Sequence, residues 1–594
     1  MKKQNSIHYF ILFFILLAAI LFRIANLDKP YGLWLDEMIS FNTANKETFL
    51  DIFNHSLKRD LHAPFYYILL FFWMKLFGQA DLTLRLFSVA PGILTVLLLY
   101  LTGKELDSKK TGLYAAFFGA INSLLIYYSQ EVRIYSLISF LSILTIFFVI
   151  KIIKKPCKLN YAGFVLSNIL LLYTHTIGFI FVFFEILIFG IYIYIKKKDI
   201  LKNYILSSLT IAALFIPYTF HIFKIASSPR IGISTQWWCD INLSKIFFSI
   251  GDLFSPLLLN IYGAHLDYID FLFSPVNIVI SIIPTIIALI GIVIAVIPKQ
   301  KWFSDLRKPK FLETSVISEN SITNSLPTYY NNKNVFINLI FLICICFLIV
   351  FTGLYFKGKA VFITRYIIEV SPLLILIFTY GLLKIKNKLI STILIYIYIV
   401  ITLSCFLVFS ASAFNDNRIS GLKTPITLLE EYELDNNSAI ISMFYRKTWF
   451  SKYYPEEQGA SFNSIHWKNY SKFLSSEEKK PFKNFTKEKF YTKLKPFISG
   501  ENTKYYENKL KKEFINPLPS NKYLIILNRK RFHSYNNKEL EEIARNNLKY
   551  QDSKMALMLF SRFTETLLKI CDEELKFIEK KEELGWELYF YQKP

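Results

Sequence analysis

Two adjacent carboxylates are the first residues in this chain that could take part in a reaction. Asp36 and Glu37 follow Trp34 shortly after an apolar run over residues 7–25. A carboxylate can serve as a general base, because it can take the proton of a hydroxyl group as that group attacks an electrophile. Acidic side chains are also typical of an exposed helix N-terminus, where the helix dipole favours them. The pair alone favours neither interpretation.

Two histidines lie beside apolar runs and have equally plain structural interpretations. Asp60 and His62 lead through Ala63 to Pro64 and a short apolar segment. A capping segment with Pro64 in the first helical turn is the simpler interpretation of these residues in isolation. His175 ends an apolar run in the sequence Tyr-Thr-His, and a lone histidine at such a place is more often structural than chemical.

Charged residues also stand at the ends of two other apolar runs. Glu131 and Arg133 lie in the segment IYYSQEVRIY (126–135), which ends at Tyr135. An acid and a cation so close to hydrocarbon indicate a buried pair or an anion site, although tyrosines there are also typical of the interfacial belt. Arg365 and Tyr366 open a later run, where snorkelling explains a cation equally well.

The elements that must position these residues are membrane helices. Of 594 residues, 53% are hydrophobic and 19% are charged, which is too apolar for an ordinary soluble chain. The apolar residues form runs close to the roughly 17–25 residues that cross a bilayer. The predicted spans are residues 7–25, 84–102, 113–128, 134–150, 159–173, 177–195, 203–220, 276–298, 334–356, 366–383 and 389–412. The sequence therefore predicts a polytopic α-helical membrane protein with about eleven or more transmembrane helices.

The distribution of lysine predicts the orientation of these spans. With the N-terminus in the cytoplasm, every predicted inner loop is rich in lysine, as the positive-inside rule requires. These loops are residues 104–110, 151–158, 196–202, 299–333 and 384–388. They account for the net charge of +23 without a nucleic-acid partner. Counting the short apolar segment 62–78 as a span would invert every later loop, so we interpret it as a re-entrant or interfacial helix in a large first outer loop, residues 26–83.

The chain changes character after its last apolar run. Residues 414–594 are rich in Lys, Glu, Asn and Tyr and contain no segment able to span a membrane. Short apolar stretches at 439–445, 522–527, 555–560 and 586–591 look like strands, and residues 538–548 look helical. The predicted organisation is a transmembrane module, residues 1–413, followed by a soluble extracytoplasmic α/β domain, residues 414–594.

The order of these motifs resembles the glycosyltransferase C superfamily. The similar branch is bacterial, with sequences like families 39 and 83, and is related to protein O-mannosyltransferases and lipid A aminoarabinose transferases. The resemblance is carried by LWLDE (33–37), DLHAPFYYILLFFWMKLFG (60–78), LRLFSVAPGILTVLLLYLTGKEL (84–106) and YYSQEVRIYSL (127–137), with weaker support from YTH (173–175) and TRY (364–366). It covers residues 1–220 well, the later helices loosely and the tail hardly at all.

The sequence departs from the superfamily at the start of the short apolar segment. Members commonly have His-Pro-Pro or Lys-Pro-Pro where this chain has His62-Ala63-Pro64, so the first proline is missing. The lipid A branch favours lysine at the position of His62, which argues against lipid A as the substrate.

The resemblance implies transfer of a sugar from a polyprenyl-phosphate donor to a hydroxyl acceptor on the outer face of the bacterial plasma membrane. The acceptor can be an envelope glycolipid, a polysaccharide or a protein. It implies Asp36 as the base, with Glu37 orienting it or holding the acceptor. Arg133 and Arg365 would bind the donor phosphate, because a guanidinium group can contact two of its oxygens at once. The remaining residues of the expected cavity are Asp60, His62, Glu131, Tyr135, His175 and Tyr366. Direct attack predicts inversion at the anomeric carbon. No cofactor is implied, and a divalent metal stays an open alternative.

Two other classes of protein compete with an enzyme. A lipid-linked sugar flippase would favour ionisable residues near the bilayer midplane, whereas those found here gather at outer helix ends, with Glu185 and Glu369 among the exceptions. A non-catalytic sensor or scaffold would need fewer spans than this chain has. Release of free lipid phosphate from a lipid-linked sugar separates the enzyme from both alternatives.

Overall fold

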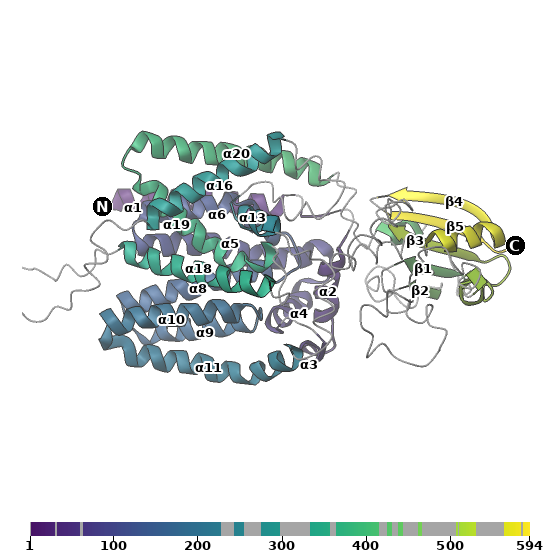
Figure 1. The fold of residues 1–594 in the computed structure, drawn as a ribbon, viewed down its shortest axis with the longest axis horizontal. Coiled ribbons are helices and arrows are strands. Elements are labelled where there is room, and N and C mark those ends of the chain that lie inside the picture. Colours follow the sequence, from purple (N-terminus) through teal and green to yellow (C-terminus); the bar gives the residue numbers. More distant parts are fainter. Residues whose placement is uncertain are drawn as a thin grey trace, which may run out of the picture. The chain divides into compact units, whose positions relative to one another are not determined.

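The computed structural model divides the chain into two compact units. The first unit comprises Met1–Leu27, Thr43–Gly232 and Ile241–Ala411, and the second comprises Asp28–Asn42, Ile233–Asp240 and Ser412–Pro594. The first is a bundle of helices, and the second contains a β-sheet (Figure 1). The structure describes residues 2–25, 27–29, 32–59, 63–226, 243–254, 275–296, 333–356, 364–414, 424–429, 438–443, 461–465, 507–508, 510–529, 564–583 and 586–594.

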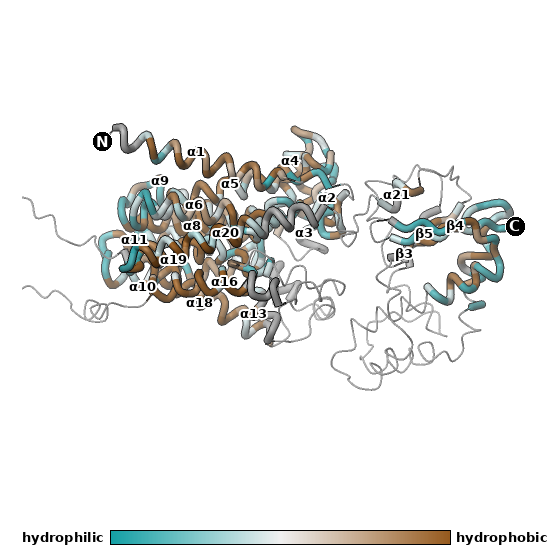
Figure 2. The backbone as a smooth tube through the Cα atoms, turned by 90° about the horizontal axis from the view of Figure 1, so that it is seen from above, coloured by the Kyte–Doolittle hydropathy of each residue, from teal (hydrophilic) through white to brown (hydrophobic). Residues whose placement is uncertain are grey.

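The bundle consists of long apolar helices, which are brown over most of their length in Figure 2. They are α1 (Lys2–Ile24), α5 (Asp81–Leu106), α6 (Lys109–Ile121), α7 (Ser123–Ser129), α8 (Tyr135–Lys154), α9 (Lys158–Leu172), α10 (Gly178–Lys196), α11 (Lys198–Ala226), α16 (Pro275–Val296), α18 (Lys333–Phe356), α19 (Ser371–Lys384) and α20 (Lys388–Phe414). Within the described residues, 6 helices are long and apolar enough to cross a membrane, or 7 if the bent pair α6–α7 counts as one span. The chain is therefore a membrane protein.

Each predicted span overlaps a helix of the bundle, and two differ from the prediction in an instructive way. The span predicted over 113–128 is bent by 59° between α6 and α7. The bend occurs because Asn122 caps α7, its side-chain oxygen accepting the N–H of Leu125 at 3.0 Å. The span predicted from residue 366 begins only at Ser371, since residues 364–370 form two 3-10 turns. The number of helices that cross the membrane stays a prediction.

Three helices follow α1 in the predicted first outer loop. They are α2 (Leu35–Ala44), α3 (Phe49–Arg59) and α4 (Phe65–Phe77). Within the first unit, α3 and α4 lie at the end of the bundle opposite the chain's N-terminus (Figure 1). The N–H of Phe65 donates to the carbonyl of Tyr173 at 3.0 Å, and the indole of Trp73 donates to the carbonyl of Thr83 at 2.9 Å. These bonds fasten the short apolar helix α4 to the turn after α9 and to the start of α5.

Glycines allow helices in the bundle to approach closely. A Cβ atom added at Gly291 of α16 would lie 2.6 Å from the carbonyl oxygen of Phe378 of α19. A Cβ atom added at Gly103 of α5 would lie 2.9 Å from Cα of Gly112 in α6. Small residues at such crossings are typical of membrane helices, which associate through close packing rather than through a hydrophobic driving force.

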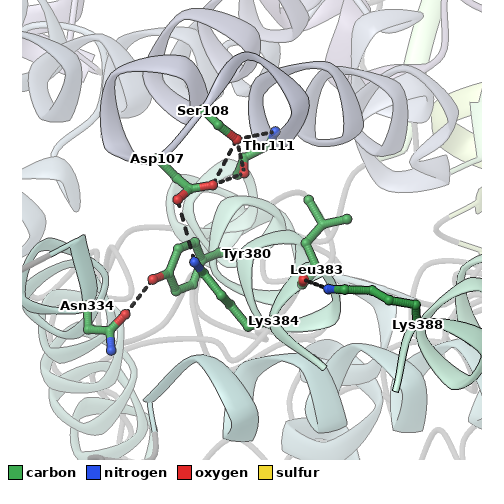
Figure 3. A network of polar contacts seen from close by, with 8 residues as sticks. All are labelled: Asp107, Ser108, Thr111, Asn334, Tyr380, Leu383, Lys384 and Lys388. Carbon is green, nitrogen blue, oxygen red and sulfur yellow. Dashed lines mark hydrogen bonds and ion pairs between the residues drawn. The ribbon is translucent and has the colours of Figure 1, made fainter. Parts of the chain in front are cut away.

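Several predicted inner loops meet at one end of the bundle, which we call the lysine end and define as residues 104–110, 151–158 and 384–388. Lys151 Nζ lies 3.3 Å from Glu105 Oε1, which joins α8 to α5. Lys384 Nζ lies 3.7 Å from Asp107 Oδ1, which joins α19 to the α5–α6 turn (Figure 3). Asp107 also accepts a hydrogen bond from Ser108 at 2.9 Å. Ion pairs thus connect the loops of the lysine end with one another.

The second unit contains a five-stranded mixed sheet. Its strands are β1 (Ala439–Met443), β2 (Ser461–Ile465), β3 (Tyr523–Arg529), β4 (Lys576–Glu583) and β5 (Trp586–Gln592), in the order β2-β1-β3-β5-β4. β1 pairs in parallel with β2 and β3, whereas β5 pairs antiparallel with β3 and β4. Strands β1, β3 and β5 coincide with predicted stretches. The predicted stretches 538–548 and 555–560 lie outside the described residues, and the extracytoplasmic location of this unit stays a prediction.

Candidate active site

The turn between α7 and α8 carries the first group of predicted site residues. Glu131 and Arg133 lie in this turn with exposures of only 2% and 5%, and Tyr135 begins α8. The side-chain amide of Gln130 donates to the backbone carbonyls of Phe22, Arg23 and Ala25 at 3.2, 3.3 and 2.8 Å. The turn is therefore fastened to the C-terminal end of α1, at the end of the bundle opposite the lysine loops.

Aromatic rings connect Arg133 with the second predicted cation. The guanidinium carbon of Arg133 lies 5.6 Å from the ring centroid of Tyr135. That ring meets the ring of Tyr128 edge-to-face at 4.8 Å. The hydroxyl of Tyr128 lies within electrostatic range of both Glu131 and Arg365. The structure thus links the segment 128–135 to Arg365 through Tyr128.

Arg365 is linked through Tyr366 to His175, which lies in the turn after α9. Its guanidinium carbon lies 5.3 Å from the ring centroid of Tyr366, and the ring of Tyr366 stacks on that of His175 at 6.1 Å with an interplanar angle of 17°. His175 is buried, with its Nδ1 atom 3.1 Å from Oε1 of Glu369. We call this run the cation–aromatic ladder; its members, in order, are Arg133, Tyr135, Tyr128, Arg365, Tyr366, His175 and Glu369.

The turn that carries Arg365 has a second anchor. Thr364 Oγ1 donates to Oδ2 of Asp252 at 2.8 Å, and both residues are buried. Asp252 ends α13 (Leu243–Asp252). Asp252, Glu369 and Tyr128 were not among the predicted site residues. The available signal was weak: Glu369 is an acid within an apolar run, where an ionisable residue is costly and marks function by default.

Asp36 and Glu37 belong to the second unit and occupy the first turn of α2. Glu37 is fully buried, and its Oε2 atom accepts the N–H of Trp34 at 3.2 Å. Asp36 is partly exposed. An acid in the first turn suits the helix dipole, but the burial of Glu37 departs from the exposed helix start that the sequence also allowed. Asp36 is thus the more exposed carboxylate of the pair.

Asp60 and His62 lie outside the described residues. Within the described residues, no three His, Cys, Asp or Glu side chains converge as metal ligands would.

The arrangement suits an anionic ligand. Arg365 is partly exposed, so its guanidinium can meet a ligand, whereas Arg133 lies deeper. Two guanidinium groups joined by tyrosine rings offer hydrogen-bond donors to an anion and flat faces to a sugar. The buried acids Glu131, Asp252 and Glu369 balance the cations. This balance lowers the cost of holding guanidinium groups near hydrocarbon.

A family model supports the sequence resemblance. The model described as dolichyl-phosphate-mannose-protein mannosyltransferase matches residues 61–221, which include Glu131, Arg133, Tyr135 and His175. A search of curated protein sequences finds no match to this chain.

Solved structures support the fold. ArnT from Cupriavidus metallidurans in the apo state matches with a TM-score of 0.52 and 8% identity over 99% of this chain and 98% of that chain. ArnT bound to undecaprenyl phosphate gives 0.49 and 9% over the same shares. The archaeal oligosaccharyltransferase AglB from Archaeoglobus fulgidus, with an inhibitory peptide and a dolichol-phosphate, gives 0.42 and 12% over 99% and 74%. Residues 61–221 are thus similar to the mannosyltransferase family model, and the chain shares its fold with apo ArnT.

Proposed function

We propose that this protein transfers a sugar from a polyprenyl-phosphate donor to a hydroxyl acceptor in the bacterial cell envelope, with inversion at the anomeric carbon. The observation that carries the proposal is the cation–aromatic ladder, which gathers Arg133 and Arg365 at one end of a membrane bundle. The name of the matching family model describes a donor of the same kind, mannose on dolichyl phosphate. Glycosyl transfer is thus the activity that both the side chains and the family support.

In the proposed reaction, the acceptor hydroxyl attacks the anomeric carbon of the donor sugar. The bond between that carbon and the phosphate oxygen breaks, and polyprenyl phosphate leaves with the bonding electrons. The leaving group is already an anion, so it needs cations rather than an acid. We assign this phosphate to Arg365, which is partly exposed, and to Arg133, which is linked to Arg365 through the rings of Tyr135 and Tyr128.

Asp36 takes the proton of the attacking hydroxyl in this proposal. Its partial exposure suits a base that must meet an acceptor, whereas Glu37 is buried and bonded to the backbone of Trp34. Glu37 therefore holds the start of α2 and orients its neighbour. A well-placed base contributes roughly 10²–10⁴ in rate.

The proposed location is the bacterial plasma membrane, with the lysine end in the cytoplasm and the ladder on the outer side. The pairing of lysine loops at one end of the bundle supports this orientation. It places the donor headgroup in the outer leaflet and leaves residues 414–594 outside the cell. A flippase would use the same lipid, but it would release no lipid phosphate.

The proposal is tested with the full-length protein in lipid nanodiscs that contain a panel of polyprenyl-phosphate hexoses and pentoses. The acceptors are supplied as bacterial envelope extract, and free polyprenyl phosphate is measured by mass spectrometry. We expect release with at least one donor. We expect Asp36→Asn to abolish release while the donor still binds, because the amide cannot take a proton.

Asp51→Asn is the matched control, because Asp51 is an exposed acid of the same loop, in the first turn of α3, bonded to Thr48. This variant should release lipid phosphate at the wild-type rate. An Asp36→Asn protein that keeps full activity would remove Asp36 as the base. In sealed vesicles, a wild-type protein that moves the lipid-linked sugar across the membrane without releasing phosphate would replace the transferase by a flippase.

A further inference from the structure

We propose that Glu369 is a positioning residue, which holds Arg365 in place through His175 and Tyr366. The inference rests on the proposed function, since it takes Arg365 as the group that meets the donor phosphate. It assigns to a buried carboxyl, which the transfer reaction itself does not use, the task of orienting the phosphate-binding cation.

The proposed positioning of Arg365 starts from the hydrogen bond between Glu369 and His175. The two atoms lie 3.1 Å apart, across 194 residues of sequence. The side chains are 1% and 3% exposed. Within the described part of the chain, Oε2 of Glu369 accepts no hydrogen bond. The bond from Oε1 to His175 is therefore the polar contact that stabilises this buried carboxyl. The hydrogen bond between Nδ1 and Oε1 fixes the orientation of the imidazole ring.

The oriented imidazole supports the ring of Tyr366. The two rings are nearly parallel, with an angle of 17° and centroids 6.1 Å apart. On the same turn, the guanidinium of Arg365 lies 5.3 Å from the centroid of Tyr366. A guanidinium group over a tyrosine ring is held by the charge distribution of the ring. A rotation of the imidazole would therefore move the ring beneath Arg365.

The local backbone explains why such support is needed. Arg365 lies in a 3-10 turn, Thr364–Tyr366, and Glu369 lies in a second one, Ile368–Val370. Short 3-10 turns have poorer hydrogen-bond geometry than an α-helix. Side chains must therefore supply the anchors. Asp252 holds the turn at Thr364 with a bond of 2.8 Å, and Glu369 holds it through His175.

The consequence for catalysis follows from the length of the arginine side chain. A long flexible cation contributes to a transition state only if it is already oriented, because a misplacement of about 1 Å can reduce the rate by about 10²-fold. Loss of the Glu369 carboxyl should therefore weaken the stabilisation of the leaving phosphate by Arg365. It should leave the transfer of the acceptor's hydroxyl proton to Asp36 unaltered.

The test is a double-mutant cycle on lipid phosphate release, with Glu369→Ala, Arg365→Ala and the double variant in nanodiscs. We expect Glu369→Ala to lower kcat/KM for the donor by about 10- to 100-fold. We expect the double variant to be about as active as Arg365→Ala alone, because Glu369 has nothing left to position. Glu369→Gln should restore most of the activity, since its amide oxygen still accepts the Nδ1 proton.

Glu185 provides a matched control, since it is a fully buried acid of α10 that the proposed site does not include. Glu185→Ala should show no coupling to Arg365→Ala. The fold-change in kcat/KM of the double variant should equal the product of the two single fold-changes. If Glu369→Ala fails to fold, as judged by size-exclusion chromatography, Tyr366→Leu tests the same link higher in the ladder and should show the same coupling to Arg365→Ala.

Two results would overturn the inference. One is a Glu369→Ala effect that multiplies fully with that of Arg365→Ala. The other is a Glu369→Gln protein as impaired as Glu369→Ala. A wild-type protein that releases no lipid phosphate with any donor would instead contradict the proposed function, so the two failures are distinguishable.

Discussion

The two ends of the helical bundle use charge in opposite ways. At the lysine end, Lys151 and Glu105 pair with side chains that are 29% and 28% exposed, and Lys384 is 47% exposed where it meets Asp107. At the opposite end, Glu131, Arg133 and Glu369 are exposed by at most 5%. Exposed pairs are solvated on their own and contribute little, whereas buried charges depend on one another. In the proposed orientation, charge at the lysine end directs how the bundle is inserted, whereas charge at the other end is held in a fixed arrangement.

The largest expected effect is on activity at the buried end. Arg365→Ala and Arg133→Ala should each lower the rate of lipid phosphate release by about 10²–10³-fold, which is typical for loss of one group that stabilises a developing oxyanion. Arg365→Lys should recover only part of the loss, because an ammonium group cannot contact two phosphate oxygens in the same planar way. The measurement is release at saturating and at limiting donor. Unchanged donor kinetics in Arg133→Ala would remove Arg133 from the phosphate site.

A smaller effect is expected on stability at the same end. Arg23 is fully buried in α1 and donates to the backbone carbonyls of Gly119 and Ala120, both at 3.2 Å. Arg23→Ala should lower the free energy of unfolding by about 1–3 kcal/mol, because it leaves buried carbonyls without their donor. Thermal unfolding of the purified protein in detergent measures the change. An unaltered melting temperature would show that water replaces the guanidinium group. Water would then reach this end of the bundle more easily than the burial of Arg23 indicates.

The smallest effect is expected at the lysine end. Lys384→Ala removes the ion pair with Asp107 but leaves Asp107 bonded to Ser108 and Thr111. The free energy of unfolding should fall by less than about 1 kcal/mol. The difference from wild type should shrink further in 0.5 M salt, because exposed charges are screened. A loss as large as that of Arg23→Ala would contradict the contrast between the two ends.

The sequence predicted the helices well because hydropathy alone indicates where a membrane helix lies. It predicted the break at Asn122 poorly, since a single polar residue in an apolar run is compatible with a straight span. The structure shows that this residue caps a new helix, with its side chain on the N–H of Leu125. The late start of α19 had a visible signal in Ser371-Pro372, because proline favours the first turn of a helix.

The sequence offered only some of the residues that form the candidate site. Arg133, His175 and Arg365 could be chosen because charged or ionisable residues at the ends of apolar runs are costly. Their partners could not, because a partner is a matter of distance in space. Glu369 meets His175 across 194 residues, and Asp252 meets Thr364 across 112 residues. No pattern of spacing within one segment reports such pairs.

The amide of Gln130 has a consequence for how the protein is made. It satisfies carbonyls at the end of α1, which leaves the ribosome more than one hundred residues before Gln130 does. In hydrocarbon such groups are costly to leave open. Until synthesis has passed residue 130, α1 must find temporary partners in water, lipid headgroups or the insertion machinery. The hydrogen bonds at the end of α1 are thus completed only after the α7–α8 turn has been synthesised.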